Sequence, residues 1–297
     1  TGPGLLRQFS VFLKRSLVQQ YRDIGLLTFL ALTVMASLFI CFIFRSYIYT
    51  PSIPEVCQAI TIPELKQACL LPLGREQLLG FSFMSTVALA LFSGISSLKI
   101  FGPERTVFWR EQSTGTSTLM YFLGKFIASI PANAFLPFVF MGIAYALGAP
   151  PTDFWPMYGC ALAVQFIALG MGLVVSIIAP PEVSTMGIIV VMVINLMFSG
   201  GDPTLVAFNE MNSSLVGYIP YTSFMRYALE ALYIINITPY RQRFNDFIEN
   251  IDSGMLTMLN YKMSDLTFCV VVLVVWAVVA NIVSFFVLLF WNRKKRI

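Results

Sequence analysis

Long apolar windows, uncharged in their interiors, alternate with short polar connections along the whole chain. A helix that crosses a bilayer needs about 20 largely apolar residues. Six windows reach or approach that length: 24–44, 77–98, 126–151, 154–181, 183–201 and 266–292. The sequence shows no alternating strand pattern of the kind found in membrane barrels. The pattern therefore predicts an all-α polytopic membrane protein with six transmembrane helices.

The composition supports this prediction. Of the 297 residues, 57% are hydrophobic and 11% are charged, whereas soluble domains carry roughly 25% charged residues. Three of the five cysteines lie inside apolar windows, where cysteine usually behaves as a small hydrophobe. The chain begins at Thr1 without a recognisable signal peptide. We therefore expect it to be part of a longer polypeptide with a soluble domain upstream.

The first 23 residues predict a helix outside the bilayer. Over 5–22, apolar and basic residues alternate at helical spacing, which is typical of an amphipathic helix in the membrane interface. A simple basic flank of the first span is the alternative. The apolar positions are Leu5, Phe9, Phe12, Leu13, Leu17 and Tyr21, and the basic ones are Arg7, Lys14, Arg15 and Arg22.

The loop over 46–76 follows the first span and contains Cys57 and Cys69. A disulfide between them is one possibility if the loop is external, and it would contribute about 3 kcal/mol by the chain-entropy relation. Two free thiols or a bridge between subunits are the alternatives.

Small and polar residues mark the spans themselves. Serines and threonines follow one stripe of the second span, where they bond their own backbone or hold helices together, or else line a partly polar pathway. Pro131 and Pro137 predict kinks in the third span. Three glycines of the fourth span predict close helix contacts, namely Gly159, Gly170 and Gly172.

Residues 201–265 contain no full-length span. We expect a re-entrant or interfacial segment, a helix over 221–235, and an exposed loop over 238–265. Counting basic residues gives the orientation, because cytoplasmic connections carry more of them. Of the 19 lysines and arginines in the chain, four lie in residues 1–23, four in the 99–125 connection and four at the C-terminus. Both termini are therefore predicted to be cytoplasmic, and the two glycosylation sequons, at Asn212 and Asn236, fall on the predicted outside.

The sequence carries no catalytic motif that we recognise. It has no histidine, no phosphate-binding loop and no zinc signature, so we expect no catalytic or metal site and no nucleic-acid partner. The apolar windows carry no charge except at their edges, which disfavours a proton-coupled carrier or an ion channel. Any energy source must therefore lie outside this chain.

The stretch over 102–125 is the main charged interruption, with four charged residues within eight: Glu104, Arg105, Arg110 and Glu111. A short helix tied to spans at both ends is a candidate contact for a soluble partner. The sequence GPERTVFWRE…GTSTLMYFLGKFIASIP resembles the cytoplasmic connection and third span of G-subfamily (white/pleiotropic-drug type) ABC exporters. A second match is MFSG at 197–200 followed by YIPYTSFMRYALEALYIIN at 218–236. The resemblance extends over essentially the whole chain in span order.

This resemblance implies the membrane half of an ATP-driven exporter, with ATP and Mg²⁺ bound by a domain upstream. It makes 1–23 the connecting helix and 101–117 the coupling segment, with Pro103–Gln112 as a helix resting on the ATPase. Glu104, Arg105, Arg110 and Glu111 would couple the two domains. Two membrane domains would pair, as copies or related halves, around a substrate cavity lined by Ser85, Leu89, Phe92, Ile189, Val193 and Leu196.

Two features depart from the family pattern. Gly201 and Asp202 stand where some members carry a leucine plug, and the cysteine pair lies in the first external loop instead of before the last span. We therefore expect an exporter of hydrophobic or amphipathic substrates, such as lipids, sterols or xenobiotics, in the plasma membrane or an organelle membrane. The alternative is a non-transporting scaffold or receptor-like subunit with the same fold.

Overall fold

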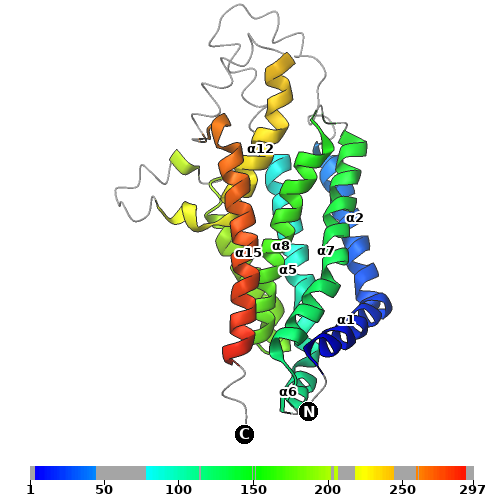
Figure 1. Cartoon of the computed structure of the whole chain (residues 1–297). Helices are drawn as coiled ribbons and strands as arrows, with labels where there is room; N and C mark the ends of the chain where they lie inside the picture. The colour runs from blue at the N-terminus through cyan, green and yellow to red at the C-terminus, as the bar shows by residue number, and fades with distance from the viewer. Residues whose placement is uncertain are drawn as a thin grey trace, which may run out of the picture.

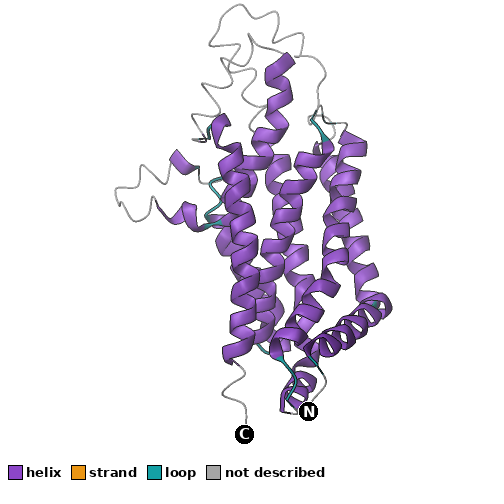
Figure 2. Cartoon of the chain, in the orientation of Figure 1, coloured by secondary structure: helices purple, strands orange, loops and turns teal. Residues whose placement is uncertain are grey.

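The computed structural model describes residues 4–44, 78–113, 115–148, 150, 152–201, 204–206, 218–243, 259 and 261–291. These residues form helices and short loops, without a strand among them (Figure 2). Five helices are long and apolar enough to cross a membrane: α2 (Ile24–Phe44), α5 (Gly80–Phe101), α7 (Thr118–Gly148), α8 (Phe154–Ile178) and α15 (Leu266–Trp291). A sixth, α9 (Pro181–Met197), is apolar but has 17 residues. The predicted all-α polytopic class is confirmed.

The apolar windows place the spanning helices well, and the third span, predicted over about 118–147, is α7. This helix starts at Thr118, eight residues before the uncharged apolar window, and so includes Lys125. It continues as one helix of 31 residues through Pro131 and Pro137. Neither proline ends the helix.

Helix α8 lies at the centre of the bundle, with α5 and α15 packed against it (Figure 1). Glycine allows these close contacts. A Cβ on Gly172 would lie 1.9 Å from the Ser97 hydroxyl of α5, and one on Gly170 would lie 2.8 Å from the backbone of Ala280 in α15. The predicted close contacts are confirmed at these two positions. At Gly159 the prediction is wrong, because nothing lies within 4 Å of a Cβ there.

Polar side chains inside the bundle bond to backbone and to one another. Ser82 and Thr86 donate to their own i−4 carbonyls. Ser93 of α5 donates to the Gln165 carbonyl of α8 at 2.6 Å, and the Gln165 amide donates to Asn133 of α7 at 3.1 Å. Both predicted structural roles, bonding to the helix itself and joining neighbouring helices, are therefore present.

Between α9 and α15, the chain forms a short 3₁₀ turn, η3 (Ile219–Thr222), and then α12 (Phe224–Arg243). Helix α12 packs against α15, α8 and α5, and its residues 224–237 are buried. This confirms the helix predicted over 221–235. The exposed loop predicted over 238–265 is wrong at both ends, because α12 continues to Arg243 and Leu259 and Tyr261 are buried against Tyr233.

The predicted modification sites are mostly outside the described residues, as Cys57, Cys69 and Asn212 all are. Asn236 lies in α12 and is fully buried, with its amide donating to the Leu232 carbonyl at 2.8 Å. This burial leaves no room for a glycan on the folded chain, so the structure contradicts a sugar at Asn236.

Helix α1 (Leu5–Arg22) lies across one end of the bundle, and Asp23 alone separates it from α2 (Figure 1). The short helix α6 (Arg105–Ser113) and the last turn of α15 lie at the same end. Large apolar side chains of α1 remain exposed, with Leu6 at 84% and Tyr21 at 94%. Such a surface suits the apolar side of a membrane interface. The orientation of this end in the membrane stays a prediction.

Candidate coupling site at the junction of α1, α6 and α7

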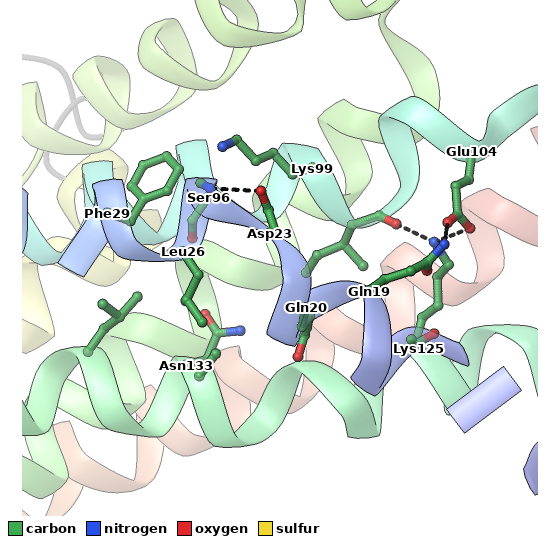
Figure 3. Close-up of a pocket in the computed structure, with 15 residues that line it drawn as sticks. Gln19, Gln20, Asp23, Leu26, Phe29, Ser96, Lys99, Glu104, Lys125 and Asn133 are labelled. Atoms are coloured by element: carbon green, nitrogen blue, oxygen red, sulfur yellow. Dashed lines mark hydrogen bonds and ion pairs between the residues drawn. The ribbon is translucent and has the colours of Figure 1, made fainter. Parts of the chain in front are cut away.

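The charged connection between α5 and α7 folds into two short helical pieces. A 3₁₀ turn, η2 (Gly102–Glu104), leads directly into α6. The predicted helix over Pro103–Gln112 therefore exists, with a 3₁₀ first turn. Because η2 follows α5 without a break, it holds the Glu104 carboxylate against the first turns of α7 and the side of α1 (Figure 3).

Glu104 is the centre of a network of charged groups. Its carboxylate lies 2.6 Å from the Lys125 ammonium of α7 and 3.8 Å from the Arg15 guanidinium of α1. Gln19 of α1 donates to the other oxygen at 2.5 Å. Arg15 in turn lies 2.6 Å from Glu111 of α6. We call Arg15, Glu104, Glu111 and Lys125 the junction cluster, and it joins α1 to the charged connection and to α7.

Lys125 is the most deeply buried member, with its side chain 6% exposed. Besides its ion pair, the ammonium donates to the Ile100 carbonyl at 2.7 Å. It also faces the rings of Phe101 and Tyr121, at 5.6 and 5.4 Å from their centroids. A buried ammonium is stable only when it is paired and hydrogen bonded, and Lys125 meets both conditions.

An aromatic group lies beneath the junction cluster, with Tyr121 of α7 at its centre. The Tyr121 ring lies 5.4 Å from Phe12 of α1, 6.0 Å from Phe101 of α5 and 4.5 Å from Phe108 of α6, measured between ring centroids. Its hydroxyl is 3.5 Å from Glu104. Edge and tilted ring contacts add to the energy of apolar burial, so the three helices joined by the junction cluster are also held, together with α5, by aromatic contacts.

The sequence permits this contact through a single glycine. A Cβ on Gly124 of α7 would lie 2.8 Å from the Phe12 Cβ and 3.1 Å from the Leu13 backbone nitrogen of α1. Any larger residue would therefore force α1 away from α7. Glycine next to Lys125 thus allows both the close backbone approach and the buried ion pair.

The charges around Glu104 also set its ionisation. Burial opposes the charged form of this carboxylate, but the hydrogen bond and charge of Lys125, with help from Gln19 and Arg15, outweigh that effect. The pKa of Glu104 therefore lies below its ordinary value, and the carboxylate is ionised at neutral pH.

The structure brings together two of the four residues predicted for coupling. Glu104 and Glu111 both belong to the junction cluster. Arg110 is exposed, and no ion pair joins it to another described residue. The side chain of Arg105 is outside the described part of the chain.

The two cations of the junction cluster, Arg15 and Lys125, were not among the predicted coupling residues. Lys125 carries a recognisable signal, because a lysine directly after a glycine in the first turns of an apolar span needs a buried partner. Arg15 gives no such signal, since it lies among several basic residues of an amphipathic helix.

A second buried charge pair lies in α12, between the fifth and sixth apolar windows. Arg226 and Glu230 are 4.0 Å apart, with side chains 9% and 3% exposed. The Arg226 guanidinium stacks on the Tyr221 ring at 3.9 Å and faces Tyr227 at 5.1 Å. Its Nε and Nη1 atoms have no hydrogen-bond partner among the described residues. A count of charges in the apolar windows could not find this pair, because α12 is not one of them.

The residues predicted to line a substrate cavity occupy different environments. Ser85 and Leu89 of α5 are buried within the bundle, and Val193 of α9 is 44% exposed. The others are half-buried, namely Phe92, Ile189 and Leu196. Within one chain, α9 meets α5 through Ile188 and Met192, which surround Gly94. The cavity assignment, which involves two paired domains, stays a prediction.

A bundle of apolar helices, closed at one end by a transverse helix and a short charged helix, defines a multi-span membrane domain of the transporter type. A family model described as ABC-2 type transporter matches residues 67–294, and the chain belongs to this family. Its curated relatives make it a transmembrane domain of the ABCG type.

Three relatives illustrate the similarity. White-brown complex homolog protein 30 of Arabidopsis thaliana is 23% identical over 73% of this chain and 19% of its own length. ABC transporter G family member 28 of the same plant is 22% identical over 73% of this chain and 18% of its own length. ABC transporter G family member 25 of Oryza sativa is 24% identical over 68% of this chain and 19% of its own length. The chain thus spans about a fifth of the length of these relatives.

Proposed function

We propose that this chain is the membrane-spanning half of an ATP-driven exporter of hydrophobic or amphipathic molecules. Membership of the ABC-2 type family makes the chain the membrane component of an ABC transporter. Coupling of its movement to an ATPase is supported by the junction cluster, which joins the transverse helix α1, the short helix α6 and the span α7.

A cluster of this kind suits force transmission. Separating ion pairs that are partly shielded from water is costly, so elements joined by them move as one body. A push on α6 therefore reaches α7 through Glu104 and Lys125, and reaches α1 through Glu111 and Arg15. Arg110 extends from the same helix into solvent, where it is free to contact another domain.

ATP and Mg²⁺ belong, in this proposal, to a domain outside the chain. The printed sequence contains no phosphate-binding loop. Among the described residues, no three His, Cys, Asp or Glu side chains gather in one place. The side chains at hand therefore do not fit a nucleotide–metal site, and the contribution of this chain is to move.

Pairing with a second membrane domain, identical or related, is supported by α9. Its outer face exposes a run of apolar side chains, including Met186 at 69%, Val190 at 56% and Met197 at 59%. Such a face needs lipid or another apolar surface against it. Val193 belongs to this face, which is compatible with a cavity shared between two copies.

The test uses the full-length protein in proteoliposomes, with ATP hydrolysis and substrate export measured on the same sample. Glu111→Gln is expected to keep ATP hydrolysis but to lower the export per ATP by about tenfold, because one lost charge-assisted contact amounts to about 1.4 kcal/mol. Arg110→Ala should have the same effect through the surface of α6. Lys14→Ala is the matched control, since Lys14 is an exposed cation of α1 outside the junction cluster.

Export per ATP equal to the wild type in both variants would reject the coupling role. Absence of any ATP-dependent export by the wild type, across lipid and drug substrates, would favour the scaffold alternative. The predicted cavity has its own test: Phe92→Ala should change the stimulation of ATP hydrolysis by substrates and leave the basal rate as it is.

A further inference from the structure

A cavity of about 510 Å³ lies between α1, α2, α5 and α7, next to the junction cluster (Figure 3). Pockets of roughly 300 to 1,000 Å³ are typical of small-molecule sites. Polar and apolar side chains lie next to each other in its lining. The polar ones include Gln20, Asp23 and Lys99, and the apolar ones include Leu26, Phe29 and Leu136. The cavity is therefore itself amphipathic.

Four charged side chains face this cavity, and two of them neutralise each other. Glu104 and Lys125 form the 2.6 Å ion pair described above. The other two, Asp23 and Lys99, are exposed, and neither forms an ion pair with a described residue. The Lys99 ammonium lies over the Phe29 ring, 5.0 Å from its centroid. The cavity thus presents one available cation and one available anion.

Both available charges gather around the first turn of α2. The Asp23 carboxylate accepts the Gly25 N–H at 2.7 Å through one oxygen, which caps the helix. A Cβ on Gly25 would lie 2.1 Å from the Lys99 nitrogen, 2.9 Å from Asp23 Oδ1 and 3.2 Å from Asp23 Oδ2. The Lys99 ammonium and the Asp23 carboxylate therefore occupy the room that a side chain at Gly25 would need, and glycine allows these two opposite charges to lie close to the same turn.

The surroundings indicate where a ligand would come from. Tyr21 and Leu27, on either side of this turn in the sequence, are 94% and 66% exposed. Exposed apolar side chains around a polar pocket are typical of an interface with lipid. A ligand that enters here would bring a polar head beside Asp23 and Lys99 and an apolar tail toward Leu136.

We propose that this cavity binds a membrane phospholipid with a zwitterionic, primary-amine headgroup, such as phosphatidylethanolamine. Lys99 donates to the phosphate, and the free oxygen of Asp23 accepts from the ammonium of the headgroup. Both contacts are charge-assisted hydrogen bonds. A choline headgroup has no N–H to donate, and an anionic glycerol headgroup offers no cation to Asp23. The site does not depend on the proposed export function, because a lipid can bind here whether or not the protein transports.

The experiment measures how added lipid raises the melting temperature of the delipidated full-length protein in detergent. Phosphatidylethanolamine is compared with phosphatidylcholine and phosphatidylglycerol, all with the same acyl chains. We expect the wild type to respond at the lowest concentration of the ethanolamine lipid. Lys99→Met should require about tenfold more of every phospholipid, the equivalent of one charge-assisted contact.

Asp23→Asn tests the other half of the site. Asparagine still caps a helix, so α2 keeps its first turn while the anion is lost. This variant should lose the preference for ethanolamine over choline. Lys14→Met is the matched control and should behave like the wild type, because Lys14 is exposed on α1 and does not line the cavity.

Each of three results would overturn the proposal. The first is equal protection of the wild type by all three lipids, and the second is a wild-type response in both Lys99→Met and Asp23→Asn. The third is equal protection by soluble phosphoethanolamine, because that would make the ligand a small soluble molecule instead of a lipid.

Discussion

The junction cluster and the Arg226–Glu230 pair in α12 both bring opposite charges together, but they are built differently. At the junction, every contact joins two different elements. In α12, both charges come from the same helix, four residues apart, and Arg226 depends on the faces of Tyr221 and Tyr227. A buried pair between elements can carry movement from one to the other, whereas a pair within one helix sets the local shape of that helix.

The two sites also differ in how much contact they keep with water. The carboxylates of the junction cluster keep some contact with water, since the side chain of Glu104 is 16% exposed and that of Glu111 is 28% exposed. The α12 pair has almost none. Desolvation is the main cost of a buried ion pair, so the α12 pair should be the more sensitive of the two to loss of one partner.

Arg226→Met is expected to have the largest effect. It leaves the Glu230 carboxylate buried without its cation, and breaking such a pair typically costs about 3 to 5 kcal/mol. The melting temperature of the purified full-length protein measures this loss. Arg226→Lys keeps the charge but not the planar group that stacks on Tyr221, and it should be affected less. A melting temperature of Arg226→Met equal to the wild type would remove the distinction between the two sites.

Glu104→Gln comes next, with an expected loss of about 2 kcal/mol. The effect is smaller because the Lys125 ammonium keeps its hydrogen bond to the Ile100 carbonyl and because water can reach the position of the lost charge. Adding Lys125→Met should restore part of the stability, since the second change removes the buried charge that the first left alone. Melting of both single variants and the double variant forms a thermodynamic cycle. Additive losses would show that the two residues do not interact.

The third prediction concerns pH. Because the pKa of Glu104 is lower in the folded protein than in the unfolded chain, its contribution to stability is complete above the unfolded value and is lost as the pH falls through the folded one. The stability difference between the wild type and Glu104→Gln should therefore stay constant from pH 7 down to about pH 5 and shrink in more acid solution. A difference that instead grows on acidification would contradict this sign.

The smallest effect on stability is expected for Arg110→Ala. This side chain is exposed and forms no ion pair among the described residues, so the change in unfolding free energy should stay within about 0.5 kcal/mol. Its melting temperature can be measured on the same preparation used for export. A marked loss of stability would mean that Arg110 belongs to the internal network and not to the outer surface of α6.

The sequence could predict the parts of the fold that depend on composition. Windows 24–44 and 266–292 match α2 and α15 to within one residue, because an apolar run of that length has one stable solution in a bilayer. Glu104 and Glu111 can also be recognised from the sequence, because they are charged residues between two apolar runs.

What the sequence could not predict depends on neighbours that are distant in the chain. Lys125 finds its partner, Glu104, on the other side of α6, and Arg15 finds Glu111 across 96 positions. Helix α12 carries Arg226, Glu230 and several tyrosines, which on their own are typical of a half-exposed helix. Its burial is imposed by α15, α8 and α5, and no local pattern contains that information.

The attachment of α1 along most of its length has a mechanical consequence. The helix has 18 residues and is therefore about 27 Å long. Gln8 near its start accepts the Ser117 N–H, Arg15 in its middle pairs with Glu111, and Gln19 near its end donates to Glu104. A rod fixed at several points along its length cannot pivot about one of them. A displacement of the charged connection should therefore carry α1 along as a whole and move Asp23, where α2 begins, in the same direction.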